Sequence, residues 1–298
     1  MNRVNVNSMN QGGKSFLSNF QRNTMQKYAE LSPVSKTFVL ILVIFVVIFL
    51  SYTGYVFYQN FSEFENKQPY LIKDTLLGSQ QTMIKANAVP EPSNGKYGVE
   101  WTYSFWMFID NQNYKGQTGY SHIFHKGQFG YNQPTAASDA ATIKPRIFCP
   151  MVELDNTSNK LRISLNTYPF DTLNGTQSYQ EVKVIDNIPV NKWFHFTLVC
   201  AEKSVDIYIN GFLKEHWVLS NIPRWNYGNV FICQAGGFIG LLSRFRYFNY
   251  AIAPHQIDQL MEVGPSKKPC VNSNELPPYL SKDYWFQTSN PGIQNPVN

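Results

Sequence analysis

The segment "NKWFHFTLVCAEKSVDIYINGFLKEHW", residues 191–217, decides the fold class. Apolar side chains alternate with polar ones in its first part, so one face of an extended strand would carry Phe194, Phe196, Leu198 and Cys200. The same alternation continues at Val205, Ile207 and Ile209. Asn210-Gly211 then supplies the positive φ angles of a two-residue hairpin turn. The segment therefore predicts an antiparallel meander of three strands.

Further strand patterns surround this meander. Residues 99–110, "VEWTYSFWMFID", place Trp101, Tyr103, Phe105, Met107 and Ile109 on one face of a strand. Similar patterns lie at 120–127, 145–154 and 160–168, two more lie within 228–253, and Pro254 to Gly264 bound one short helix. Aromatic residues make up 15% of the chain, which suits pleated sheets. The predicted fold class is all-β, a jelly-roll β-sandwich of eight or more strands.

An apolar segment precedes the predicted sandwich. Every residue from Phe38 to Leu50 is apolar, and no charge occurs from residue 37 to residue 58. As a helix these 22 residues rise about 33 Å, enough to cross a hydrocarbon core of about 30 Å. A cleaved signal peptide would have a shorter apolar region nearer the start, and a buried core helix rarely holds so long an apolar run. Residues 37–58 are therefore predicted to form a single transmembrane helix.

The charges beside this helix predict its orientation. Five Lys or Arg residues against Glu30 give residues 1–58 a charge of +4, out of a net +5 for the chain. Basic residues stay on the cytosolic side, so the N-terminus is expected inside. Residues 15–31 would form either an amphipathic helix in the membrane interface or a polar tail, and the pattern does not decide between them. A nucleic-acid-binding domain would concentrate its positive charge in its folded part, so no nucleic acid partner is expected.

These signals divide the chain into five segments. Residues 1–36 are predicted to be a polar, basic tail, and residues 37–58 the membrane span. Residues 59–95 are predicted to be a stalk or linker, because "NAVPEPSNGKYG" at 87–98 is a break by composition. The jelly-roll domain is expected over residues 96–266, and residues 267–298, rich in Pro and Asn, are expected to be irregular.

Several of these segments resemble a known family. Residues 191–217 resemble the W-x-H…Y-x-(D/N)-G signature of laminin-G-like, or concanavalin A-like, jelly rolls, and "GGFIGLLSRFRYFNYAIAPHQIDQL" resembles that family's closing strand and short helix. "WTYSFWMFID" with "HIFHKG" resembles, more narrowly, the membrane-anchored members of large double-stranded DNA viruses, which are minor capsid or virion membrane proteins. The superfamily resemblance spans about residues 97–265. It implies binding to sugars, proteins or lipids, sometimes with calcium, and glucan hydrolysis in a minority of members.

The catalytic motif of the glucanase members is incomplete here. Their E-x-D-x-x-E strand places two carboxylates together for glycoside hydrolysis. The nearest match begins at Glu153 and Asp155, but Ser158 occupies the position of the second catalytic carboxylate. We therefore expect no catalytic residues and no enzyme activity, with Glu153 and Asp155 as solvated residues at a strand end.

No cofactor is expected either. Asp110, Asn111, Asn113 and Asp171 offer oxygen ligands in loops, but no D-x-D-x-D-G loop is present, so calcium is not supported. His122 and His125 lie three residues apart on a predicted strand and should point to opposite faces.

Two further groups are candidate sites. Trp217, Trp225 and Tyr227 lie near the loop "SNIPRWNYG", where exposed rings could stack on a glycan, although core positions are the favoured interpretation. The resemblance implies a candidate disulfide between Cys233 and Cys270, since laminin-G-like modules place one around the final strand and helix. A reducing compartment would prevent it.

The leading functional hypothesis is a non-enzymatic structural protein. It would be held in a membrane by its helix, in a virion if viral, and would bind a protein layer such as capsid proteins through the jelly-roll domain. A surface lectin that binds glycans is the alternative, and a glucanase is a third and weaker hypothesis.

Overall fold

The computed structural model describes residues 26, 28–94, 98–114, 119–131, 147–168, 180–269 and 293–294. The chain forms two compact units, residues 1–63 and residues 64–298. Most of residues 15–31, where an amphipathic helix is one of two predicted alternatives, lies outside the described residues.

The described part of the first unit consists mainly of one apolar helix. Helix α2 runs over Pro33–Asn66, and its last residues belong to the second unit. None of its residues is buried, and the mean hydropathy of its most apolar window is 2.7. Its 34 residues rise about 51 Å. The helix is thus long and apolar enough to span a membrane, and it is longer than the predicted residues 37–58 because it continues through the polar sequence to Asn66.

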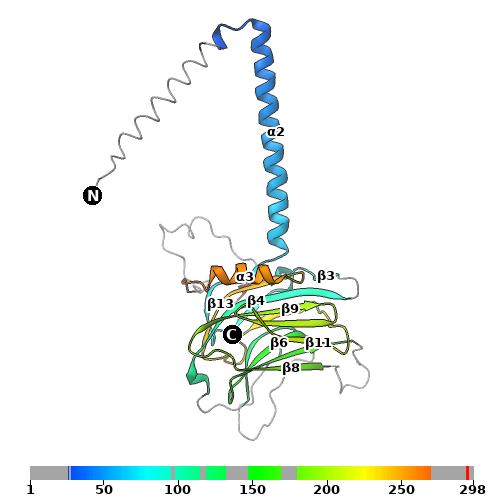
Figure 1. Cartoon of the computed structure of the whole chain (residues 1–298), viewed down its shortest axis with the longest axis vertical. Helices are drawn as coiled ribbons and strands as arrows, with labels where there is room; N and C mark the ends of the chain where they lie inside the picture. The colour runs from blue at the N-terminus through cyan, green and yellow to red at the C-terminus, as the bar shows by residue number, and fades with distance from the viewer. Residues whose placement is uncertain are drawn as a thin grey trace, which may run out of the picture. The chain divides into compact units, whose positions relative to one another are not determined.

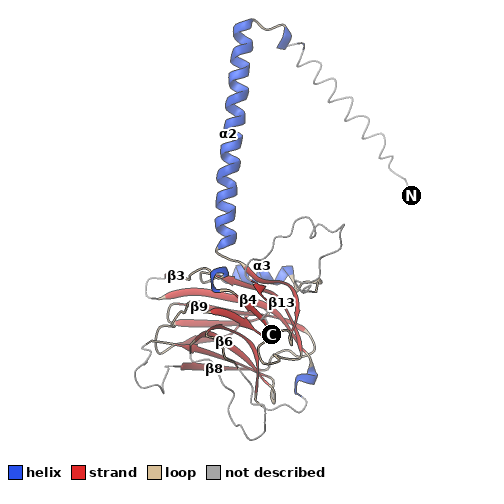
Figure 2. Ribbon diagram, turned by 180° about the vertical axis from the view of Figure 1, so that it is seen from behind, coloured by secondary structure: helices blue, strands red, loops and turns tan. Residues whose placement is uncertain are grey.

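The second unit is a sandwich of two antiparallel sheets (Figures 1 and 2). Sheet A has the order β1-β13-β4-β9-β10-β11, with β3 paired to β4. Its strands are β1 (Tyr70–Leu77), β3 (Ser93–Asn94), β4 (Val99–Ile109), β9 (Trp193–Ala201), β10 (Ser204–Ile209), β11 (Phe212–Val218) and β13 (Gly240–Phe248). Sheet B has the order β14-β2-β12-β5-β6-β7-β8. Its strands are β2 (Thr82–Ile84), β5 (Tyr120–Gly127), β6 (Phe148–Asp155), β7 (Lys160–Asn166), β8 (Gln180–Asp186), β12 (Asn229–Ile232) and β14 (Ile293–Gln294). Two short 3-10 helices cover Ala86–Ala88 and Asn111–Tyr114.

The core lies between the two sheets and is strongly aromatic. The five alternating side chains of β4, from Trp101 to Ile109, are each 0% exposed, which confirms the predicted inward face. Phe105 packs edge-to-face on Phe124 of sheet B with ring centroids 5.7 Å apart, and Phe245 of β13 lies 4.8 Å from Phe124. Such aromatic pairs add about 0.5–1.5 kcal/mol each beyond the area they bury.

The meander predicted from residues 191–217 is confirmed. Strand β10 pairs with β9 and β11, and Asn210 and Gly211 have φ angles of 51° and 77°. Helix α3 (Pro254–Val263) follows β13 and ends at Gly264, also as predicted. Its buried Ile257 packs with Val199 and Phe248, so α3 covers part of the outer face of sheet A.

The predicted stalk over residues 59–95 is wrong. Residues 59–66 continue helix α2, and Tyr70–Leu77 form β1, which pairs with β13 at the edge of sheet A. Leu71, Ile72 and Leu76 are buried in the core. The sandwich therefore begins about 25 residues before the predicted boundary at residue 96.

Two other regions differ from the prediction. Strand β8 was not predicted, and it forms the edge of sheet B beside β7. In the predicted irregular tail, Ile293–Gln294 form β14, which pairs with β2. Residues 270–292 and 295–298 of that tail lie outside the described residues.

Candidate functional site

The three candidate glycan-binding aromatics do not form one patch. Trp217 is 8% exposed and belongs to the core, as favoured from its strand pattern. Trp225 is half-buried, with the Nζ atom of Lys126 4.6 Å from its ring centroid. Tyr227 is 77% exposed. Of the three, Tyr227 has the freely accessible ring.

The outer face of sheet B carries a buried polar network. His122 and His125 are both 0% exposed, and their Nε2 and Nδ1 atoms lie 2.7 Å apart. The expectation that they point to opposite faces is wrong. Register with β6 shifts between His122 and Phe124, and this bulge turns both imidazoles to the same side of the strand.

Glu153 belongs to the same face, and its prediction as a solvated residue is also wrong. Its carboxylate is 0% exposed, lies 2.6 Å from a guanidinium nitrogen of Arg162, and accepts a hydrogen bond from the Tyr131 hydroxyl at 2.9 Å. Burial and the neighbouring carboxylate raise the pKa of Tyr131, which therefore remains a hydrogen-bond donor at neutral pH. Glu153 is thus engaged by two structural partners.

Asp155 is half-buried and closes a local turn. Burial acts to raise the pKa of Asp155, but hydrogen bonds from Thr157 and Ser158 outweigh it and lower that pKa. Ser158 lies in this turn, at the position where the glucanase motif has its second catalytic carboxylate. This stretch offers no pair of carboxylates arranged for acid and nucleophile.

Two of the candidate calcium ligands, Asp110 and Asn113, serve structural roles. Asp110 accepts a hydrogen bond from the backbone N–H of Gln112, and buried Asn113 accepts one from the N–H of Ile239. Asp171 lies outside the described residues. Within the described ranges, His, Cys, Asp and Glu side chains form no group of three or more that could hold a metal ion.

The cysteines are core residues wherever the structure describes them. Cys149, Cys200 and Cys233 are each 0% exposed, and burial raises the pKa of Cys149 to about 12. Cys270 lies outside the described residues, so the disulfide between Cys233 and Cys270 stays a prediction.

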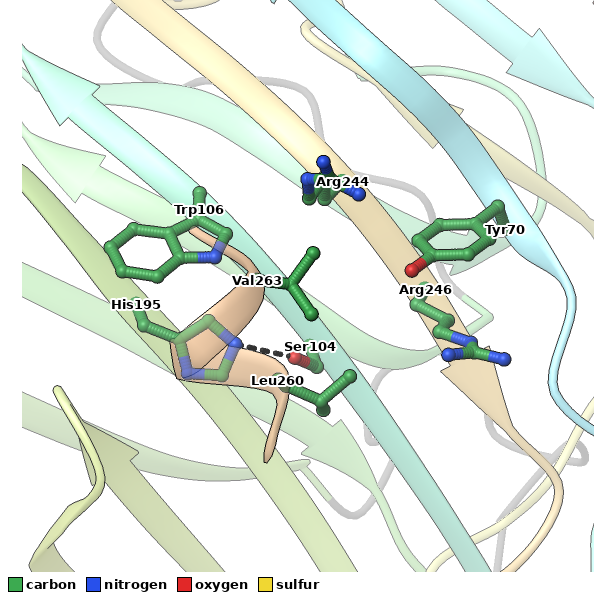
Figure 3. A pocket seen from close by; sticks show the side chains of 8 residues that line it. All are labelled: Tyr70, Ser104, Trp106, His195, Arg244, Arg246, Leu260 and Val263. Carbon is green, nitrogen blue, oxygen red and sulfur yellow. Dashed lines mark hydrogen bonds between the residues drawn. The ribbon is translucent and has the colours of Figure 1, made fainter. Parts of the chain in front are cut away.

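The outer face of sheet A holds a hollow that sequence reasoning missed (Figure 3). Its floor is formed by four strands, and the side of α3 contributes two apolar residues. The lining side chains are Tyr70 of β1, Ser104 and Trp106 of β4, His195 of β9, Arg244 and Arg246 of β13, and Leu260 and Val263 of α3. Topology brings these residues together from positions as far apart as 70 and 263.

A hydrogen-bonded pair lies at the floor of this hollow. The Ser104 hydroxyl and the His195 Nε2 atom are 2.8 Å apart, and both residues are at most 2% exposed. Burial lowers the pKa of His195 to about 4, so the imidazole is neutral at physiological pH. The Thr197 hydroxyl is 3.4 Å from His195 Nδ1, where a serine hydrolase would place a carboxylate. The pair therefore lacks the acid that would orient a catalytic imidazole.

Exposed apolar side chains lie on the terminal strands of the two sheets. Strands β8 and β11 end sheets B and A, and Lys183 of β8 forms a 2.6 Å ion pair with Glu215 of β11. We define the edge surface by its five exposed apolar residues, which are Val182, Val184, Phe212, Leu213 and Val218. Edge strands that carry exposed apolar side chains are common features of interaction sites.

The architecture defines the class of protein. Two antiparallel sheets around an aromatic core, closed by a short helix on one outer face, form a jelly-roll β-sandwich. Residues 84–258, more than half of the chain, match the family described as the concanavalin A-like lectin/glucanases superfamily. The chain belongs to this superfamily.

Solved structures that are similar to part of the chain share low sequence identity with it. The receptor binding domain of botulinum neurotoxin C/D mosaic serotype is 15% identical, with a TM-score of 0.40, over 56% of this chain and 37% of that chain. The botulinum neurotoxin serotype D binding domain is 14% identical, with a TM-score of 0.43, over 64% of this chain and 42% of that chain. The chain thus spans less than half the length of these structures. A comparison with curated protein sequences finds no match.

Proposed function

We propose that this chain is a membrane-anchored, non-enzymatic binding protein that tethers a bilayer to a protein layer. The observation that carries the proposal is helix α2, whose apolar residues have no buried contact and which ends only three residues before strand β1. Confinement by the helix would raise the effective concentration of the sandwich against repeated partners on a neighbouring layer. The viral resemblance makes a capsid shell the proposed layer, with the N-terminus on the cytosolic side.

The membrane anchor is tested by alkaline carbonate extraction of membranes that contain the full chain. Replacing Val43 and Val46 with Lys should move the protein from the membrane pellet to the supernatant, because each central Lys costs about 2.5–3.5 kcal/mol of insertion free energy. The control is Val184→Lys on the sandwich, which adds a charge outside the helix and should leave the protein in the pellet. Extraction of the unmodified chain would contradict the anchor.

The edge surface is the proposed contact with the protein layer. Its aliphatic and aromatic side chains are exposed on the terminal strands of the two sheets, which suits a protein partner better than a sugar. A photo-reactive amino acid at Val184 or Val218 should cross-link the capsid protein in purified particles, while the same group at exposed Gln259 of α3 should not. Absence of the chain from particles would reject the capsid proposal and leave the anchor standing.

A second candidate, glycan binding, is favoured by one observation. The ring of Tyr227 is 77% exposed beside half-buried Trp225, which resembles an aromatic platform for a sugar. A glycan array with the full chain in detergent tests this candidate. If the chain is a lectin, it should bind specific glycans on the array, and Tyr227→Ala should abolish that binding. Absence of glycan binding by the unmodified chain would reject the lectin candidate.

A further inference from the structure

We propose that the hollow on the outer face of sheet A is a binding site for a phosphate-class anion, held by Arg244 and Arg246 (Figure 3). Both guanidinium groups line the hollow from β13, and the other six lining residues carry no carboxylate. Arginine presents a planar fork of donors that matches phosphate oxygens. The site is separate from the edge surface and from Tyr227, and its existence does not depend on the proposed tethering function.

Arg244 is the residue that points most directly to a ligand. Its Nε atom is buried and has no hydrogen-bond partner, and no ion pair of its guanidinium occurs within the described residues. A buried N–H donor without a partner is costly, and a bound anion would supply the missing acceptor. Arg162, by contrast, forms an ion pair with the buried carboxylate of Glu153.

The backbone at Arg244 is strained, and this strain changes the direction of its side chain. Its φ angle is 48°, a left-handed value that a long L side chain rarely adopts. Register between β13 and β4 shifts between Ser243 and Arg246, so β13 has a bulge at this point. Ser243 accepts a hydrogen bond from the Ser266 N–H, which fixes the bulge. Bulges that re-aim a side chain and strained backbone both cluster at functional sites.

Arg246 is also positioned to bind an anion. Its Nε donates to the carbonyl oxygen of Gln68 at 2.9 Å, and its guanidinium lies 4.5 Å from the Tyr70 ring centroid. A carboxylate of Glu65 lies 3.8 Å from one terminal nitrogen, but that side chain is 48% exposed and neutralises the charge only weakly. Arg246 therefore retains donors for an anion while its stem is oriented.

The rest of the hollow suits a phosphate that carries an apolar group. At the floor, the Ser104 hydroxyl can donate to a ligand when His195 Nε2 donates to the Ser104 oxygen. Leu260 and Val263 form an apolar wall, of which Val263 is 53% exposed. Gln68 lies two residues after the end of α2, so the site follows the proposed membrane span closely in the chain. The phosphate could belong to a lipid headgroup or be free in solution, and the two sources are separable by experiment.

The test uses the full chain in a neutral, phosphate-free detergent. Binding of dioctanoyl phosphatidic acid, dioctanoyl phosphatidylcholine and inorganic phosphate is measured by isothermal titration calorimetry at constant ionic strength. Phosphatidic acid binding at least tenfold tighter than inorganic phosphate would assign a lipid headgroup, and equal binding would assign free phosphate. Failure of both anions to bind would overturn the proposal, as would equal binding of all three probes, which would indicate apolar association alone.

The variant Arg244→Asn distinguishes an anion-binding arginine from one that only stabilises the fold. Asn tolerates left-handed φ values better than Arg, so this variant should keep or raise the melting temperature of the unliganded chain. The same variant should weaken binding of the anion at least tenfold. Lys214→Gln, which removes an exposed positive charge from β11, is the matched control and should bind as the unmodified chain does. Unchanged binding by Arg244→Asn would overturn the assignment.

Discussion

The Nε2 atom of His122 lies 2.7 Å from the Nδ1 atom of His125, and the groups on either side fix the direction of this hydrogen bond. His122 Nδ1 accepts from the backbone N–H of Gln234 at 3.0 Å, so the proton of His122 is on Nε2 and is donated to His125. His125 then has its proton on Nε2, which faces the carbonyl oxygen of Gln128 at 3.0 Å. Both imidazoles are therefore neutral, and an added proton on either would break one of the bonds.

This chain of hydrogen bonds predicts destabilisation by mild acid. Burial lowers the pKa of His125 from 6.5 to about 4, and it lowers the pKa of His122 well below 6.5. Between pH 6.5 and 5 the unfolded chain binds protons that the folded chain does not, so the free energy of unfolding should fall as pH falls. Each such histidine contributes up to about 1.4 kcal/mol per pH unit. Urea unfolding at pH 6.5, 6.0, 5.5 and 5.0 measures the slope.

Variants of two histidines test the assignment. His125→Asn should reduce the slope, because one titrating group is lost. His255→Gln should leave it unchanged, since His255 is exposed on α3. A free energy of unfolding that is constant over this pH range would show that the buried imidazoles do not behave as described.

The ion pair between Glu153 and Arg162 should be important for stability. Glu153→Ala leaves the partly buried guanidinium of Arg162 without its carboxylate partner and removes one of two acceptors of the Tyr131 hydroxyl, at a cost of about 3–5 kcal/mol. The matched control is Asp186→Ala, which breaks the exposed pair with Lys160 and should cost at most about 1 kcal/mol. Equal losses in chemical denaturation would contradict the burial of the first pair.

Alanine substitutions at two adjacent glycines distinguish the cost of backbone strain from the cost of steric overlap. Gly236 and Gly237 have φ angles of 84° and 55°. A Cβ atom at Gly236 would meet nothing within 4 Å, whereas one at Gly237 would lie 2.0 Å from the carbonyl oxygen of Gly78. Gly236→Ala should therefore cost about 1–2 kcal/mol, and Gly237→Ala several kcal/mol more. Melting temperatures of the two variants should differ in this order, and the reverse order would be inconsistent with the close approach.

The buried thiols should be slow to react. Burial raises the pKa of Cys149, Cys200 and Cys233, so little thiolate forms and reagents have no access. Mass spectrometry after brief treatment of the native chain with iodoacetamide should find these three cysteines unmodified. Treatment in denaturant without reductant then counts the free thiols. Four modified cysteines would exclude the predicted bond between Cys233 and Cys270, and two would support it.

Regular alternation made most of the sandwich predictable. The inward side chains of β4 and the Asn210-Gly211 turn follow directly from local pattern, because both depend on neighbours in sequence. Strand β1 was missed since Lys73 and Asp74 interrupt its apolar residues, which an edge strand tolerates.

The candidate site was less predictable because it depends on tertiary placement. Arg244 and Arg246 lie two residues apart on β13, but their neighbours Ser104 and His195 come from distant segments. The bulges at His122 and Arg244 arise from mismatched register between strands, which no local pattern reveals. Alternation alone assigned the two histidines to opposite faces for this reason.

The position of β13 in sheet A has a consequence for biosynthesis. It is the last long strand of the sandwich in the sequence, yet it lies between β1, the first strand, and β4. A growing polypeptide cannot complete sheet A until residues near 248 have left the ribosome. Until then, β1 and one edge of β4 remain unpaired. Non-local pairing of this kind slows folding and exposes strand edges to aggregation. A premature stop before residue 240 would remove β13 and leave both β1 and β4 without that partner.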